Sequence, residues 1–70
     1  MRIKSNIQEL VDKSGLRDKY IRDQLNIQQP QWRNIKKGES YPTVPKVFLL
    51  ARILDVKVDE LYEVIEEDQK

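Results

Sequence analysis

The chain has 70 residues and contains neither cysteine nor histidine. It therefore lacks the side chains that hold most zinc ions and the residue that most often acts as a general base. A chain this short also buries too little surface to enclose a deep active site, so we expect no enzyme activity, no metal and no cofactor.

The formal net charge is only +1, but the charges are unevenly distributed. Residues 1–46 contain ten Lys and Arg against five Asp and Glu, whereas residues 47–70 contain three against seven. This asymmetry indicates a basic face for a polyanion, although ordinary domains also show it by chance. No apolar run approaches the roughly 20 residues that span a bilayer, and the polar N-terminus does not resemble a signal peptide, so we expect a cytoplasmic protein.

The first expected helix begins near Ser5 and ends at Gly15. Ser5 followed by Gln8 matches a capping box, in which the two residues satisfy each other's backbone N–H groups. Glycine is a common left-handed stop at the end of a helix. The apolar residues at helical spacing are Ile7, Leu10 and Val11.

Two further helices are expected over residues 18–25 and 29–37, separated by a very short turn. Ile21 and Leu25 lie one turn apart on one face of the first of them. Asn26 follows, and asparagine tolerates positive φ better than most residues. A turn of this length forces a steep crossing of the two helices rather than a hairpin.

The third helix begins just after Ile27, which we expect to be a buried anchor in the turn. Pro30 fits only in the first helical turn, where its missing N–H has no partner to lose. Trp32 and Ile35 supply the inward face, and Gly38 ends the helix.

The remaining elements are a fourth helix capped by Thr43 and ended by Asp55, and a short fifth helix at residues 59–62. Residues 66–70 are acidic and are expected to form a disordered tail. The apolar stripe of the fourth helix is Val47, Leu50, Ala51 and Leu54. The pattern predicts an all-α fold, a compact five-helix bundle that forms one domain over residues 1–65.

The outward face of the third helix contains amide and guanidinium groups and no acid. At about 100° per residue, the positions farthest from Trp32 and Ile35 are Pro30, Arg33, Asn34 and Lys37, with Gln29 at the exposed N-terminal end of the helix. Amide and guanidinium groups are the ones that read base edges in the major groove. The same face is equally compatible with an ordinary solvated helix surface.

From Ile7 to Tyr62, about four-fifths of its length, the chain resembles the Cro/C1-type helix-turn-helix family of phage repressors and their relatives. The matching positions are Ile7, Leu10, Gly15, Leu16, Ile21, Leu25, Ile27, Ile35, Gly38, Pro42, Ala51, Leu54, Val56, Asp59, Glu60, Leu61 and Tyr62. No single motif identifies the family, but the combined spacing of the apolar positions, the two glycine stops and the proline is specific for it. The resemblance implies a lambda repressor-like DNA-binding domain that contains a helix-turn-helix, with double-stranded operator DNA as its partner.

The resemblance also implies roles for individual residues. Base contacts are implied for Gln29, Pro30, Arg33 and Asn34. Phosphate contacts are implied at the end of the third helix, in the loop after it and at the start of the second helix, from Lys36, Lys37, Ser40, Tyr41, Arg17 and Lys19. A glutamine at Gln29 suits a bidentate contact to adenine, whereas Pro30 can only touch a thymine methyl group.

Four residues depart from the family pattern. Arg17 stands where the family usually has a Ser or Thr that caps the second helix. Asp18 stands where the family usually has a glutamine that holds a phosphate, and a carboxylate repels a phosphate. Arg22 replaces a small residue, and Trp32 replaces an aliphatic one. We therefore expect the stem of Arg22 to lie on the Trp32 ring, with Trp32 itself in the core.

Several apolar residues exceed what the helical core needs. Phe48, Leu49 and Ile53 exceed one stripe of the fourth helix, and some of them could form an exposed patch with Val64 and Ile65. The interface residues expected from this set are Leu49, Ile53, Val64 and Ile65. They are either ordinary surface residues or a homodimer interface, which family members commonly build from their C-terminal helices. We favour the homodimer.

The function that the resemblance implies is sequence-specific transcriptional regulation, as a Cro-like repressor of a prophage or mobile element. The chain contains no sensor domain, so no small-molecule effector is expected. The alternative is a helix-turn-helix domain that binds a protein, such as another repressor, without binding DNA. Asp18, Pro30 and the acidic tail keep this alternative open.

Overall fold

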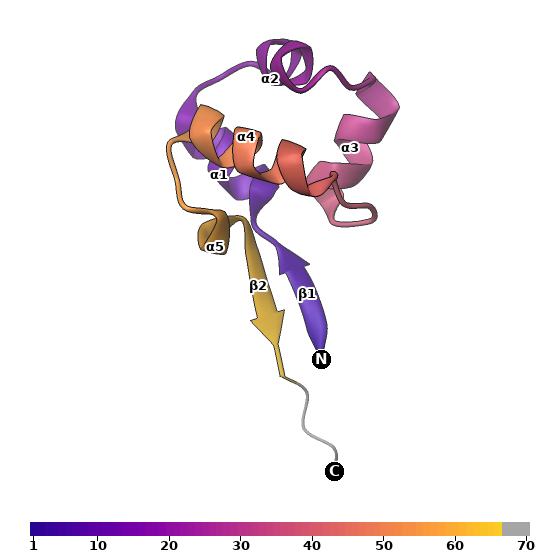
Figure 1. Ribbon diagram of the computed structural model, residues 1–70, viewed down its shortest axis with the longest axis vertical. Helices are drawn as coiled ribbons and strands as arrows, with labels where there is room; N and C mark the ends of the chain where they lie inside the picture. Colours follow the sequence, from indigo (N-terminus) through magenta and orange to yellow (C-terminus); the bar gives the residue numbers. More distant parts are fainter. Residues whose placement is uncertain (67–70) are drawn as a thin grey trace.

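The computed structural model describes residues 1–66, which form five helices and a two-stranded sheet (Figure 1). The helices are α1 (Ile7–Ser14), α2 (Asp18–Leu25), α3 (Gln29–Lys37), α4 (Val44–Leu54) and α5 (Val58–Leu61). The strands are β1 (Arg2–Ser5) and β2 (Tyr62–Ile65). Of the expected tail, only Glu66 lies within the described residues. Within residues 1–66, no helix is long and apolar enough to cross a membrane.

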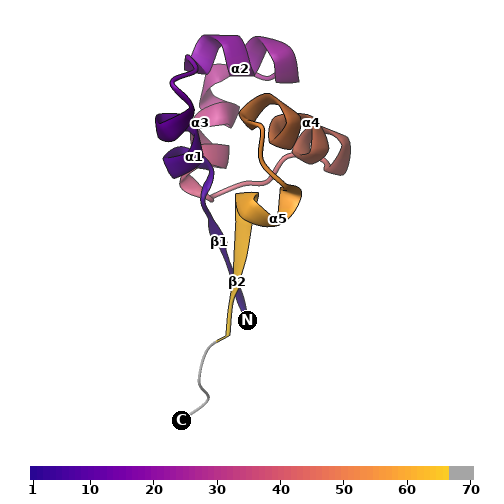
Figure 2. The same ribbon diagram turned by 90° about the vertical axis from the view of Figure 1, so that its left-hand side faces the viewer.

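The prediction of a mostly helical protein is confirmed, but the prediction of a purely all-α fold is wrong. β1 and β2 pair in antiparallel orientation, with Ile3 opposite Val64 and Lys4 opposite Glu63. The two strands project together from the helices (Figures 1 and 2). β-Branched and oppositely charged cross-strand neighbours both favour this pairing. The pairing also means that Val64 and Ile65 belong to a strand and not to a C-terminal helix.

The sheet continues into the helical body through the residue between β1 and α1. The Asn6 backbone N–H donates to the carbonyl of Leu61 at 2.9 Å, and the Asn6 Nδ2 donates to the carbonyl of Glu60 at 3.3 Å. These bonds hold the start of α1 against the end of α5. The position of the sheet therefore depends on a contact between segments more than fifty residues apart in the chain.

The expected capping box at the start of α1 does not form. Asn6 rather than Ser5 precedes the helix, and the Gln8 Nε2 donates to Asp12 Oδ1 at 3.0 Å within α1. The reason is that Ser5 is part of β1, so it is paired with Tyr62 and lies outside the helix. The local sequence pattern identified the start of the helix within two residues but assigned the wrong cap.

The ends of four helices agree with the sequence. Gly15, Asn26, Gly38 and Asp55 all have positive φ, with values of 75°, 57°, 84° and 58°. Asparagine and aspartate are the non-glycine residues that best tolerate this region. At Gly38, an added Cβ would also lie 3.2 Å from the Cβ of Ser5. Glycine at this position therefore lets the end of α3 approach β1.

The hydrophobic core lies between α1, α2, α3 and α4, with α5 closing its lower end (Figure 1). Its buried members are Ile7, Val11, Ile21, Leu25, Ile27, Trp32, Ile35, Leu50, Ala51, Leu54 and Leu61. Nearly all of these are apolar positions that the helical spacing assigned to the inward faces. The prediction that Trp32 is a core residue is confirmed, since its side chain is only 1% exposed.

The Tyr62 hydroxyl offers a test of packing at the junction of sheet and helices. This hydroxyl is buried without a hydrogen-bond partner, and burial raises the pKa of Tyr62 to about 12. Its ring packs on Tyr41 with centroids 5.6 Å apart. An unpaired buried hydroxyl carries a desolvation penalty, so Tyr62→Phe should leave the free energy of unfolding unchanged or raise it by about 1 kcal/mol.

Urea unfolding of the parent and Tyr62→Phe, with Tyr20→Phe as the matched control at an exposed tyrosine, measures this difference. If Tyr62→Phe lowers the free energy of unfolding by more than about 1 kcal/mol, the hydroxyl forms a hydrogen bond in the folded protein.

Candidate nucleic-acid interface

The relative orientation of α2 and α3 is fixed by the three residues between them. Asn26 closes α2, and the backbone N–H groups of Asn26 and Ile27 donate to the carbonyls of Asp23 and Arg22 at 3.3 and 3.2 Å. The Ile27 side chain is buried, with 9% exposure. An anchor in the middle of so short a turn leaves little freedom for α3 to move relative to α2.

This arrangement turns one face of α3 toward solvent. Trp32 and Ile35 are buried on its inner side. The side chains expected to point outward are all exposed, namely Gln29, Pro30, Arg33, Asn34 and Lys37. The four residues that the helical spacing placed on one face, and Gln29 at the N-terminal end of the helix, are therefore all accessible. That face contains no carboxylate.

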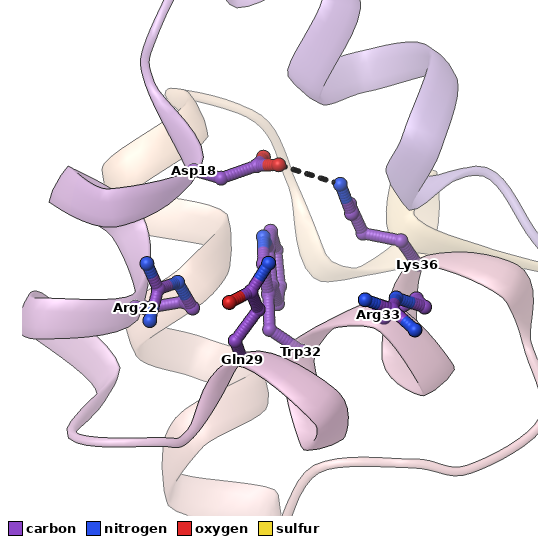
Figure 3. Close-up of a pocket in the computed structure, with 6 residues that line it drawn as sticks. All are labelled: Asp18, Arg22, Gln29, Trp32, Arg33 and Lys36. Atoms are coloured by element: carbon purple, nitrogen blue, oxygen red, sulfur yellow. Dashed lines mark hydrogen bonds and ion pairs between the residues drawn. The ribbon is translucent and has the colours of Figure 1, made fainter.

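Asp18 and Lys36 form an ion pair between α2 and α3 that the sequence did not indicate. The Lys36 Nζ donates to Asp18 Oδ2 at 2.7 Å, and the Lys36 side chain is only 14% exposed while that of Asp18 is 48% exposed. The hydrogen bond from Lys36 holds the pKa of Asp18 below its ordinary value of 3.8, although partial burial acts in the opposite direction. Asp18 therefore forms its ion pair within the protein, with a lysine of the next helix (Figure 3).

The ion pair changes two expectations about this region. Lys36 was expected to contact a phosphate, but its ammonium group is largely covered and already paired. The cation over the Trp32 ring is also Lys36, with its Nζ 5.8 Å from the ring centroid, where Arg22 was expected. The spacing within one helix could not reveal this pair, because its members are 18 residues apart on two helices.

The other residues expected to contact phosphates lie at the two ends of the α2–α3 unit. Arg17 and Lys19 are exposed at the start of α2, where Lys19 forms an ion pair with Asp23 at 3.1 Å. Ser40 is half-buried and Tyr41 is exposed in the loop between α3 and α4. Lys37, at the end of α3, is exposed on the same side as the outward face.

The apolar residues expected at a dimer interface are divided between a helix and a strand. Leu49 is 38% exposed on α4 and Val64 is 54% exposed on β2, while Ile53 and Ile65 are partly buried. Successive side chains of a strand point to opposite faces, so Val64 and Ile65 do not share one surface. Phe48, which the sequence pattern included among the surplus apolar residues, is 57% exposed on α4. The pattern missed Val44, which is 68% exposed on the same helix.

Comparison with models of known protein families gives no match, and comparison with curated protein sequences finds no relative.

Proposed function

We propose that this protein is a sequence-specific double-stranded DNA-binding regulator of transcription that inserts α3 into the major groove. The observation that carries the proposal is the exposed face of α3, which presents Gln29, Arg33 and Asn34 without a carboxylate. Guanidinium and amide groups match the acceptors and donors of guanine and adenine in the major groove. The resemblance to Cro/C1-type repressors favours a Cro-like repressor of a prophage or mobile element.

Asp18 is less of an obstacle to DNA binding than its position in the sequence indicates. A free carboxylate at the start of α2 would repel a phosphate, but the carboxylate of Asp18 accepts a hydrogen bond from Lys36 at 2.7 Å. The pair has no net charge. Arg17 next to it is exposed and positive, so the start of α2 keeps an attraction for the DNA backbone.

The proposal is tested by measuring affinity for random duplex DNA at two salt concentrations, followed by selection of a preferred site. Binding through phosphate contacts releases counterions, so the affinity should fall steeply as the salt concentration rises. The selected site should bind at least about a thousandfold more tightly than random duplex. Failure to bind any duplex at low salt would instead favour a protein-binding helix-turn-helix domain, and the exposed Val44 and Phe48 on α4 would then be its first candidate surface.

We also propose that the protein binds its operator as a homodimer. The support is the exposure of Leu49 and Val64, since exposed aliphatic side chains that a monomer does not cover are typical of an interface. Sedimentation should show a dimer at micromolar concentration and a monomer for Leu49→Asp or Val64→Asp. Gln24→Asp, an equal change of charge on exposed α2, should remain dimeric.

A dimer predicts a two-fold operator with half-sites about one helical turn apart. A parent protein that stays monomeric up to millimolar concentration would contradict the interface.

A further inference from the structure

A hollow of about 190 Å³ lies between α2 and α3, beside the outward face of α3 (Figure 3). The side chains that line it are Asp18, Arg22, Gln29, Trp32, Arg33 and Lys36. Three of these, Asp18, Arg22 and Trp32, are residues that depart from the pattern of the family that the chain resembles. Nothing in the proposed reading of bases requires it.

Two buried hydrogen-bond donors of the hollow have no acceptor. The Trp32 Nε1 and the Arg22 Nε are both buried and have no hydrogen-bond partner. The indole N–H faces the Asp18 carboxylate and helps to lower the pKa of Asp18, but the contact between them does not have the geometry of a hydrogen bond. Buried donors in proteins are nearly always paired. These two donors, which belong to side chains that line one hollow, can therefore serve an acceptor that comes from outside the chain.

The charges around the hollow indicate that this acceptor is an anion. Three cationic side chains line it against one carboxylate. That carboxylate, Asp18, is paired with Lys36. Within residues 1–66, Arg22 and Arg33 form no ion pair, and they flank Gln29 and Trp32 on opposite sides (Figure 3). Both guanidinium groups can donate to more than one oxygen of a single oxyanion.

We propose that this hollow binds a phosphate-type oxyanion, held by Trp32 Nε1, Arg22 and Arg33. Gln29 is an exposed side chain of the same rim, so rotation of its amide admits the anion to the two buried donors. The oxyanion is either a free phosphate or a phosphate of the DNA backbone. Only the second source rests on the proposed function, since the first helix of a helix-turn-helix crosses the backbone.

The experiment uses the single tryptophan of the chain, which gives one indole N–H signal in a ¹H–¹⁵N spectrum. The protein is titrated with sodium phosphate and, separately, with sodium chloride at the same ionic strength. We expect phosphate to shift the indole signal to saturation and chloride to leave it unchanged. Arg22→Gln should weaken phosphate binding about tenfold, and Arg52→Gln, an exposed arginine of α4, should leave it unchanged.

Asp18→Asn distinguishes a specific effect on phosphate binding from a general loss of structure. This substitution removes the one negative charge of the hollow and releases Lys36, so it should strengthen phosphate binding. A general loss of structure would weaken it. Weaker binding in both Arg22→Gln and Asp18→Asn would overturn the assignment to this hollow.

Titration with duplex DNA distinguishes the two sources of phosphate. If free phosphate has no effect but duplex shifts the indole signal, and Arg22→Gln lowers the salt slope of duplex binding by about one unit, the anion is a backbone phosphate. If the duplex binds and neither reagent moves the indole signal, the oxyanion site is overturned and the proposed function stands. If free phosphate binds and duplex does not, the site stands and the proposed function fails.

Discussion

Trp32→Ala is expected to lower the free energy of unfolding by about 3–5 kcal/mol, because it removes the largest fully buried side chain of the protein. The indole occupies the space between α2 and α3, where the surrounding helices can close the resulting cavity only in part. A loss of this size is comparable to the whole stability of a small domain. We therefore expect the variant to be largely unfolded at room temperature.

The measurement is thermal and urea unfolding followed by circular dichroism, since the variant has no tryptophan fluorescence. Phe48→Ala is the matched control. It removes an aromatic side chain that is 57% exposed on α4, and it should change the stability by no more than about 0.5 kcal/mol. If Trp32→Ala melts like the parent and loses only DNA affinity, its assignment to the core would be wrong.

The second large effect concerns the outward face of α3, where base-reading and phosphate-binding residues should respond differently to substitution. Gln29→Ala and Asn34→Ala should each weaken binding to the selected site by about 1–3 kcal/mol and change binding to random duplex much less. Both side chains are exposed, so their removal should not affect the fold. The measurement is a titration of each variant against the selected site and a scrambled one.

Lys37→Ala is the contrasting variant, because Lys37 lies at the end of α3, where the chain leaves the groove in the proposed complex. It should weaken binding to both DNAs by a similar factor and lower the salt slope by about one unit. Arg33 lies beside the hollow and can reach either a guanine or a phosphate. If Gln29→Ala and Asn34→Ala leave the preference for the selected site intact, α3 does not read the sequence.

The amino-acid sequence by itself determined the helices that carry the candidate site. The bounds of α2 and α3, at Asp18–Leu25 and Gln29–Lys37, agree with the spacing of apolar residues and with the stops at Asn26 and Gly38. These features are local. A helix is specified by residues three and four positions apart, and a stop is specified by the few residues that tolerate positive φ. The exposed face of α3 follows from the same spacing.

Only the tertiary structure decided how distant segments pair. β1 and β2 have four residues each, too few for an alternating pattern to stand out. Each becomes a strand because the end of α5 places Tyr62 beside Ser5. A segment of four residues does not form a strand until the helices have brought its partner strand within hydrogen-bonding distance. A two-stranded sheet is also only marginally stable by itself.

The candidate site also depends on contacts between residues that are distant in the sequence. The sequence indicated that Asp18 disfavours phosphate binding and that Lys36 favours it, because each charge was considered on its own helix. The short turn through Ile27 places the two helices so that these charges lie 2.7 Å apart. It also leaves Arg22 and Trp32 around one hollow. Charges act through distance in space, and the sequence gives only distance along the chain.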